Sequence, residues 1–324
     1  MKGKPVALVT GIAGQDGSYQ AELLLAKGYR VVGASRNPQQ AKAKLPLQIA
    51  NAVEFIAWDM LDQQSMIDTL SSYRPQEVYN FAAYSSGAGM YNDPVSVGEV
   101  NGMAVTRILE AIRTVDAGIR LCQASSREIF GDAIESPQTE STPVNPRSPY
   151  GAAKLYADSM IRIYRQRYGI FACSAILFNH ESPRRGLEFV TRKITNEAAK
   201  IKLGLAKSLH LGNLDAQRDW GFAGDFVRAM WLMLQQEQAD DYVLATSQVH
   251  SVRDLCDFTF SYLGLNYRDY VLEDQTAYRP AETALLVGDI TKARSRLKWQ
   301  PEIGCRELMQ MMVDEDLRIL SSRP

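Results

Sequence analysis

The sequence predicts an α/β protein built around a doubly wound parallel sheet. In the first half, short apolar runs alternate with amphipathic stretches of helical length, which is typical of right-handed strand–helix–strand crossovers. A glycine-rich turn follows the first apolar run within the first 20 residues, where such a sheet passes into its first helix. The composition agrees with a folded protein, because 46% of the residues are hydrophobic and 23% are charged.

Apolar residues and turn signals predict each element of the first half in order. Apolar runs predict strands at residues 6–10, 29–34, 53–57, 77–82, 120–124 and 171–177. Stretches with one apolar face predict helices between them, at residues 19–27, 65–72, 105–113 and 150–168. The first helix is expected to have Leu23, Leu24 and Leu25 on its buried side and to stop at Gly28. Residues 132–149 hold four prolines and predict a loop.

The second half of the chain has a different pattern. After residue 179 the regular alternation gives way to loops, helices and short strands. We therefore expect one domain at residues 1–180 and a smaller, mixed α/β domain at residues 181–324. A helix is expected at residues 222–235, and a strand near 242–246 is expected to rejoin the first sheet.

Charge and cysteine content exclude several classes of function. Lys and Arg total 36 against 37 Asp and Glu, so the chain lacks the basic excess typical of proteins that bind nucleic acid or anionic membranes. No apolar stretch reaches the roughly 18 residues that would predict a transmembrane helix. The four cysteines lack CxxC spacing and there are only three histidines, so we expect no metal site, no disulfide framework and a cytoplasmic location.

Gly11, Gly14 and Gly17 form a GxxGxxG pattern between the first strand and the first helix. Glycines there permit a tight turn and let backbone N–H groups at a helix N-terminus approach a pyrophosphate. A glycine-rich turn without a ligand is the alternative. The strand–turn–helix context favours a Rossmann-type dinucleotide-binding domain, with Gln15 and Asp16 beside the ligand.

The residues after the second strand favour NADP over NAD. An acidic residue there would bind the free 2′-hydroxyl of NAD, but the sequence reads Gly-Ala-Ser-Arg-Asn. Arg36 can pair with a 2′-phosphate through charge-assisted hydrogen bonds, although a solvated surface arginine is the alternative. Asp59 and Met60 follow the third strand and are expected at the adenine, unless Asp59 caps a helix.

Tyr150 and Lys154 lie four residues apart, on one face of a predicted helix. A nearby ammonium favours the phenolate and is expected to lower the pKa of Tyr150 from its usual value of about 10. The pair could then take a hydroxyl proton while hydride leaves the same carbon for nicotinamide. Ser125 and Ser126 follow the preceding strand and could hydrogen-bond the reacting oxygen, whereas a chance YxxxK match is the alternative.

Glu128 predicts a second chemical step. It follows the fifth strand, and the carboxyl ends of strands face the ligand crevice in such sheets. A carboxylate there could remove an acidic proton beside a newly formed ketone and then protonate a departing hydroxyl. This would be elimination rather than simple oxidation, although an ion pair with Arg127 or another cation is the alternative.

With these motifs in place, the chain resembles the GDP-mannose 4,6-dehydratase family, a branch of the extended short-chain dehydrogenase/reductases (the NAD(P)-dependent epimerase/dehydratases). The resemblance covers nearly the whole chain and is strongest at residues 10–18, 146–156, 176–186, 189–194 and 211–220. The last three segments are far more specific than the glycine turn or YxxxK, which many sugar-nucleotide enzymes share.

The resemblance implies a hydro-lyase mechanism. Tyr150, assisted by Lys154 and Ser126, would deprotonate the C4 hydroxyl of GDP-mannose while hydride passes to NADP+. Glu128 would take the acidified C5 proton and help expel the C6 hydroxyl as water. Hydride would return to C6, giving a GDP-4-keto-6-deoxy sugar with the cofactor unchanged and retained.

The resemblance also implies contacts with both ligands. The residues implied at the GDP-sugar are Ser85, Asn179, Val190, Lys193, Arg218, Arg279 and Glu282. Those implied at the cofactor, beyond the residues above, are Ala83, Ser85, His180 and Arg185. Arg184 and Arg185 could instead lie in a solvated loop. In this family that loop crosses a subunit interface, so the resemblance implies a homodimer or homotetramer.

The sequence departs from the family pattern at three single positions, in a smaller Ser-Gly stretch at residues 85–89, and in having only one arginine at the end of the second strand. Ser126 replaces the usual Thr, Arg127 stands where a small residue is common, and Tyr84 replaces a Gln expected near the hexose. A reshaped sugar pocket keeps two alternatives open: a related enzyme acting on another GDP-sugar as dehydratase, reductase or 4-epimerase, and a catalytically silent NADP-binding protein. A pure epimerase does not need Glu128, so that residue favours elimination.

Overall fold

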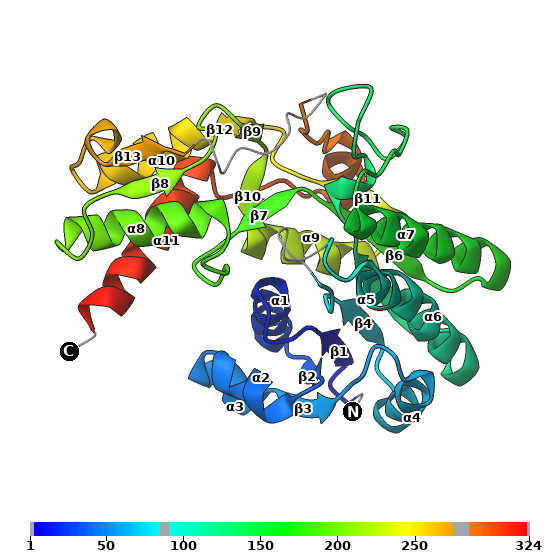
Figure 1. The fold of residues 1–324 in the computed structure, drawn as a ribbon. Helices are drawn as coiled ribbons and strands as arrows, with labels where there is room; N and C mark the ends of the chain where they lie inside the picture. The colour runs from blue at the N-terminus through cyan, green and yellow to red at the C-terminus, as the bar shows by residue number, and fades with distance from the viewer. Residues whose placement is uncertain (1–2, 85–90, 275–284, 323–324) are drawn as a thin grey trace.

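A seven-stranded parallel sheet forms the centre of the computed structural model, which describes residues 3–84, 91–274 and 285–322 (Figure 1). Its strands lie in the order β11-β6-β5-β4-β1-β2-β3. Their bounds are β1 (Val6–Thr10), β2 (Arg30–Ser35), β3 (Glu54–Ala57), β4 (Glu77–Asn80), β5 (Arg120–Ala124), β6 (Ala172–Leu177) and β11 (Tyr242–Leu244). β11 comes from the second half of the chain and pairs with β6 at the sheet edge.

The strand order reverses at β1. The chain runs outward from β1 to β2 and β3, and then crosses to β4 on the other side of β1. In sheets of this kind a ligand binds outside the carboxyl ends of the strands at this reversal. Ala7, Leu8 and Val9 of β1 are fully buried, as expected of a strand covered on both faces.

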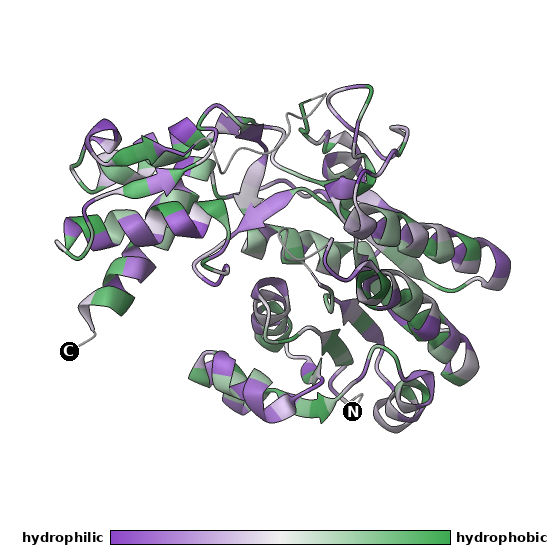
Figure 2. Cartoon of the chain, in the orientation of Figure 1, coloured by the Kyte–Doolittle hydropathy of each residue, from purple (hydrophilic) through white to green (hydrophobic). Residues whose placement is uncertain are grey.

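Helices cover both faces of the sheet. One face carries α1 (Gln15–Ala26), α2 (Pro38–Lys44), α3 (Leu47–Ala52) and α9 (Ala223–Leu234). The other carries α4 (Gln63–Tyr73), α5 (Pro94–Gly98), the π-helical turn η1 (Glu99–Met103), α6 (Ala104–Val115) and α7 (Pro149–Tyr168). The hydropathy colours alternate along α6 and α7 (Figure 2) because each presents an apolar stripe to the sheet. In α6 this stripe contains the fully buried Ile108 and Ile112.

A second lobe packs around its own apolar core. Its helices are α8 (Val190–Lys202), α10 (Val252–Tyr262) and α11 (Cys305–Ser321), grouped at upper left in Figure 1. Short paired strands accompany them: β7 (Asn179–Glu181) with β10 (Trp220–Phe222), β8 (Leu209–Leu211) with β13 (Val271–Glu273), and β9 (Gln217–Arg218) with β12 (His250–Ser251). The remaining short helices are η2 (Arg127–Ile129), η3 (Tyr267–Asp269) and η5 (Ala293–Leu297).

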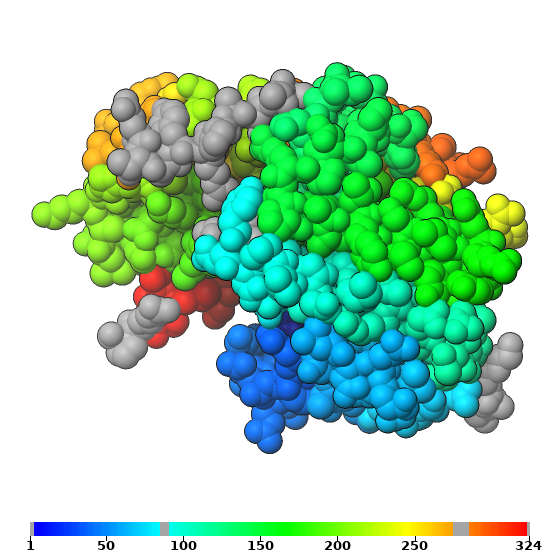
Figure 3. Space-filling model, turned by 45° about the vertical axis from the view of Figure 1, so that its right-hand side comes forward, coloured from blue at the N-terminus to red at the C-terminus, as the bar shows by residue number. Residues whose placement is uncertain are grey.

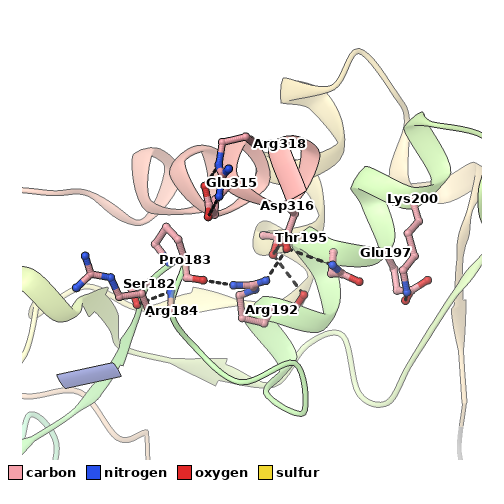
Figure 4. A network of polar contacts seen from close by, with 11 residues as sticks. Ser182, Pro183, Arg184, Arg192, Thr195, Glu197, Lys200, Glu315, Asp316 and Arg318 are labelled. Atoms are coloured by element: carbon pink, nitrogen blue, oxygen red, sulfur yellow. Dashed lines mark hydrogen bonds and ion pairs between the residues drawn. The ribbon is translucent and has the colours of Figure 1, made fainter. Parts of the chain in front are cut away.

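A buried polar network joins α8 to α11 (Figure 4). The Asp316 carboxylate, which is 0% exposed, accepts hydrogen bonds from Arg192 at 2.5 Å, Thr195 at 2.7 Å and Asn196 at 3.1 Å. Arg192 also donates to the carbonyl of Pro183, in the loop after β7. The network therefore fixes that loop to the second lobe.

The first helix begins earlier than the sequence analysis predicted. α1 starts at Gln15 rather than at residue 19, because Gly14 has extended backbone geometry and serves as its N-cap. The glycines at the start of this helix have poor intrinsic helix propensity, yet the amide of Ser18 already donates to the carbonyl of Gly14 at 3.1 Å. The prediction from local helix propensity therefore set the start of this helix four residues too late.

Among the residues that the structure describes, no helix combines the length and apolar character needed to cross a bilayer.

Candidate active site

A large cleft lies beside the carboxyl ends of the sheet strands and extends to the second lobe. Its volume is about 1890 Å³, whereas a pocket for one small ligand usually measures about 300–1,000 Å³. Residues of α5 and α8 both line it, and the cyan and yellow-green surfaces of these regions lie beside each other in Figure 3. The cleft therefore has room for two ligands.

The predicted site residues meet in this cleft, wherever the structure describes them. Its lining includes Gly11, Gly14, Gln15, Asp16, Gly17, Arg36, Asp59, Met60, Ala83, Ser126, Glu128, Tyr150, Lys154, Asn179, His180, Arg185, Val190, Lys193 and Arg218. The remaining predicted positions, Ser85, Arg279 and Glu282, lie outside the described residues.

The glycine turn requires glycine for steric reasons. Gly11 has a φ of +63°, and a Cβ there would lie 2.8 Å from the carbonyl carbon of Phe81. A Cβ at Gly17 would lie 2.4 Å from the carbonyl oxygen of Gly11. The turn therefore packs backbone against backbone at the N-terminus of α1, where main-chain N–H groups suit a pyrophosphate.

Asp16 and His180 connect this turn to β7. His180 Nε2 lies 3.0 Å from Asp16 Oδ2, and His180 Nδ1 lies 2.7 Å from the carbonyl oxygen of Phe178. Burial disfavours charge on both groups, but their mutual attraction and hydrogen bond outweigh it, so the pKa of Asp16 is lowered and that of His180 is raised. The side-chain Nε2 of Gln15 also donates to the His180 carbonyl at 3.0 Å.

After β2, the wall of the cleft includes two cationic side chains. Arg36 follows the strand directly, and Lys44 comes from the end of α2. Lys44 was not identified from the sequence. No local sequence pattern shows that the last turn of α2 lies at the cleft. Asp59 does not cap α4: it accepts from the amide of Leu61 at 3.0 Å, whereas Asp62 caps the helix.

Tyr150 and Lys154 sit on the first turns of α7. Ser148 caps this helix by accepting from the amide of Gly151 at 3.0 Å. Lys154 is 2% exposed, and its ammonium donates to the carbonyl of Ala124 at 2.7 Å. Its Nζ atom lies 5.6 Å from the centre of the Tyr150 ring.

The expected lowering of the Tyr150 pKa is wrong for this arrangement. Burial raises the pKa of Tyr150 to about 12, although a hydrogen bond with Ser126 acts in the opposite direction. Burial also lowers the pKa of Lys154 to about 8. The Lys154 ammonium donates to the Ala124 carbonyl. The four-residue spacing of Tyr150 and Lys154 therefore did not predict the direction in which the pKa of Tyr150 is shifted.

A further carboxylate lies one turn beyond Lys154, unnoticed in the sequence. Asp158 is buried and accepts from the hydroxyls of Ser125 at 2.6 Å and Ser174 at 2.7 Å. Burial raises its pKa to about 6. The sequence signal that could have identified Asp158 is an acidic residue on the apolar face of a predicted helix, because acidic side chains are seldom buried without a partner.

Glu128 both lines the cleft and forms an ion pair. Its carboxylate lies 3.0 Å from Arg127 Nη2, which is the alternative that the sequence left open. Arg127 Nε also donates to Asn179 Oδ1 at 2.6 Å. Two predicted site residues are thus joined through one guanidinium.

The remaining part of the cleft is lined from the second lobe. Val190 and Lys193 lie on α8, Arg218 lies on β9, and the Lys193 ammonium donates to the carbonyl of His210 at 2.6 Å. Tyr84 also lines the cleft. Its amide donates to the Asn101 side chain at 2.8 Å, and that side chain donates back to its carbonyl at 3.0 Å.

The two arginines after Pro183 are held by side chains of the same chain. Arg184 pairs with Glu22 at 2.6 Å and covers the ring of Tyr19 at 4.0 Å. Arg185 lies 3.1 Å from Glu181 and 3.5 Å from the centre of the Phe189 ring. This loop is therefore not the solvated segment of the alternative interpretation.

Two solved structures of other proteins share this fold. A UDP-glucose 4-epimerase from Thermotoga maritima, solved with UDP-glucose, has a TM-score of 0.85 at 22% identity and covers 97% of this chain and 99% of its own. RMD from Pseudomonas aeruginosa, complexed with NADPH, has a TM-score of 0.83 at 22% identity and covers 98% of this chain and 100% of its own.

Sequence comparisons identify the family. A family model described as GDP-mannose 4,6 dehydratase matches residues 8–312. GDP-mannose 4,6 dehydratase 2 of Arabidopsis thaliana is 48% identical over an alignment of 328 positions that covers 98% of this chain and 88% of that protein. The Homo sapiens GDP-mannose 4,6 dehydratase is 41% identical over an alignment of 351 positions that covers 99% of this chain and 94% of that protein. The chain therefore belongs to the GDP-mannose 4,6-dehydratase family.

Proposed function

We propose that this protein is an NADP-dependent hydro-lyase that converts GDP-mannose to GDP-4-keto-6-deoxy-mannose. The observation that carries the proposal is the meeting of two sets of acid–base groups in one cleft. Tyr150, Lys154 and Ser126 supply the groups for oxidation, and Glu128 supplies a carboxylate for elimination. A chain that only bound a nucleotide would need neither set.

The cofactor-binding role belongs to the glycine turn and the wall after β2. The turn of Gly11, Gly14 and Gly17 lines the cleft at the N-terminus of α1 and suits a pyrophosphate. Arg36 and Lys44 support NADP over NAD, because a 2′-phosphate needs positive partners. These residues would hold a nicotinamide cofactor, which would supply hydride acceptance at C4 and hydride donation at C6.

Tyr150 takes the proton of the C4 hydroxyl in the first half of the reaction. Its pKa of about 12 in the protein alone means that the phenol is protonated at neutral pH. We therefore place formation of the phenolate in the complex with GDP-mannose and cofactor. There the nearby Lys154 ammonium favours the charged form of Tyr150. Ser126, which lines the same wall, would hydrogen-bond the reacting oxygen and steady it.

Glu128 carries the second half of the reaction. Once C4 is a ketone, the C5–H bond is acidic, so Glu128 takes that proton while the electron pair enters the enolate. The C6–O bond then breaks, and the departing hydroxyl takes the proton from Glu128 and leaves as water. One carboxylate thus serves as base and then as acid, and it ends ionised as it began. When hydride adds to C6, C5 takes up one proton, which balances the proton that Tyr150 took from the C4 hydroxyl.

The substrate diphosphate would lie against the second lobe. Lys193 and Arg218 line that part of the cleft, and cations of this kind suit a pyrophosphate. Asn179 and Val190 would flank the sugar and nucleotide, with Tyr84 shaping the hexose pocket.

The proposal extends to the organisation of the chain. We divide it into an NADP-binding domain at residues 1–180, to which β11 contributes a strand, and a substrate domain at 181–324. We propose a homodimer or homotetramer, which is supported by the exposed apolar side chains Val95, Met103 and Tyr156 on adjacent elements. Four buried, unbridged cysteines support a cytoplasmic location.

Mass spectrometry after incubation with GDP-mannose tests the function. We expect the product to have lost one water without added NADPH, because the hydride is returned within each turnover. An unchanged GDP-mannose would contradict the proposal. Trials with other GDP-sugars would then separate an altered hexose pocket from a protein that only binds NADP.

A further inference from the structure

Arg127 is a charged side chain in an unusually buried position on the wall of the cleft. It is 8% exposed and lines the cleft beside Glu128 and Asn179. Taking a guanidinium out of water is costly unless well-placed partners compensate. Its partners therefore indicate what the buried charge does.

Two of those partners are residues of the proposed active site. Arg127 Nη2 lies 3.0 Å from Glu128 Oε1, and Arg127 Nε donates to Asn179 Oδ1 at 2.6 Å. A guanidinium is planar and presents its donors in a rigid fork. The guanidinium thus holds the Glu128 carboxylate, on η2, and the Asn179 side-chain amide, on β7, in a defined relative position.

The backbone beneath Glu128 is fixed independently of Arg127. The Ser126 hydroxyl accepts from the amide of Glu128 at 3.2 Å. A Cβ at Gly151 would lie 2.5 Å from the Glu128 carbonyl oxygen, so the first turn of α7 packs directly on this backbone. With its backbone held, Glu128 retains freedom mainly in its side chain, and Arg127 limits that freedom.

We infer that Arg127 is a positioning residue that sets the Glu128 carboxylate and the Asn179 amide as one unit at the hexose. The inference rests on the proposed dehydratase function. The Arg127 guanidinium has hydrogen-bond donors and no acceptor, so it cannot take the C5 proton from Glu128. That proton passes to the C6 hydroxyl as the C6–O bond breaks. With its oxygen engaged, Asn179 presents its N–H donors to an acceptor on the substrate.

Arg127→Met and Arg127→Lys test this role, with Arg113→Met as a matched control. Arg113 is a half-exposed arginine of α6 that pairs with Glu110 at 2.8 Å, outside the cleft lining. We expect Arg127→Met to lower kcat for water loss by about 10- to 100-fold, since small displacements of a reacting group have effects of that size. C4 oxidation should continue, so NADPH absorbance should accumulate under single-turnover conditions while KM changes less than kcat.

Arg127→Lys separates position from charge. Lysine keeps the cation but cannot reproduce the fork, so we expect it to recover only a small part of the lost rate. Wild-type kcat without NADPH accumulation in Arg127→Met would overturn the inference, and so would full recovery by lysine. If thermal unfolding shows that Arg127→Met does not fold, Arg127→Lys alone decides, because a wild-type rate there contradicts the need for the fork.

The same assay separates this inference from the proposed function. If the wild-type protein releases no water from GDP-mannose, the proposed function fails. If the wild type releases water and Arg127→Met does so equally fast, only the role of Arg127 fails. The Arg113→Met control is expected to match the wild type in kcat, KM and NADPH signal.

Discussion

The cofactor side and the sugar side of the cleft are built in different ways. The cofactor side is largely backbone: glycines at 11 and 17 allow main-chain segments to pack at distances that a Cβ would prevent. The sugar side is made of charged and polar side chains from short elements, joined by Arg127 and supported by the second lobe. Changes on the two sides should therefore produce separable defects in cofactor binding and in sugar chemistry.

Glu128→Gln is expected to have the largest effect, and it acts on the sugar side alone. Removing the acid–base group should lower the rate of water loss by about 100- to 10,000-fold. C4 oxidation should survive, giving NADPH absorbance without a dehydrated product. Glu197→Gln, at a partly exposed position of α8 paired with Lys200, is the control. Normal turnover by Glu128→Gln would show that the carboxylate has no such role.

Asp316→Ala should weaken the support of the sugar side. It leaves the buried Arg192 guanidinium without its carboxylate partner, a loss that typically costs about 3–5 kcal/mol. Urea unfolding should show the lower stability, and GDP-mannose binding should weaken more than NADP binding. Asp314→Ala, at an exposed position of the same helix, removes only a surface hydrogen bond from the Tyr262 hydroxyl and should cost about 1 kcal/mol or less. Equal stability of the two variants would contradict the account of the network.

Gly17→Ala should affect the cofactor side. Its new Cβ would meet the Gly11 carbonyl oxygen at 2.4 Å, and such overpacking costs about 1–3 kcal/mol. We expect NADP affinity, measured by titration, to fall while GDP affinity stays close to wild type. Gly98→Ala is the matched control, because a Cβ there meets nothing within 4 Å. Weaker GDP binding with unchanged NADP binding would reverse the assignment of the two sides.

The Asp16–His180 pair joins the two sides and predicts the smallest effect, a pH dependence. The raised pKa of His180 means that its stabilisation is complete below the unfolded value of about 6.5 and is lost as pH rises through the folded value. The lowered pKa of Asp16 means that its stabilisation is lost as pH falls through that lowered value. Unfolding free energies measured across pH should therefore decline on the alkaline side. His180→Phe should flatten that decline, and an unchanged profile would contradict the pairing.

The difference between the two sides also explains what the sequence could predict. The glycine turn, Tyr150 with Lys154, and Glu128 are local motifs tied to the ends of strands, and the structure brings all of them to one cleft. The link between Arg192 and Asp316 joins residues 124 positions apart, so no local pattern reveals it. The pKa of Tyr150 depends on burial, which helical spacing does not determine.

Lys44 and Asp158 illustrate the same limit. Lys44 reaches the cleft only because α2 folds back beside β2. The role of Asp158 depends on Ser125, which follows β5, and on Ser174, which lies in the neighbouring strand β6. Sequence spacing identifies residues on one helix face, but side chains contributed by other elements determine their chemistry.

Transfer of a deuterium label tests the central claim most directly. If one cleft oxidises C4, eliminates water and returns the same hydride, GDP-mannose deuterated at C4 should give a product that has lost one water and carries the deuterium at C6. Nuclear magnetic resonance locates the label, and mass spectrometry counts it. A dehydrated product without deuterium, or a label found in free NADPH, would contradict a single closed cycle in this cleft.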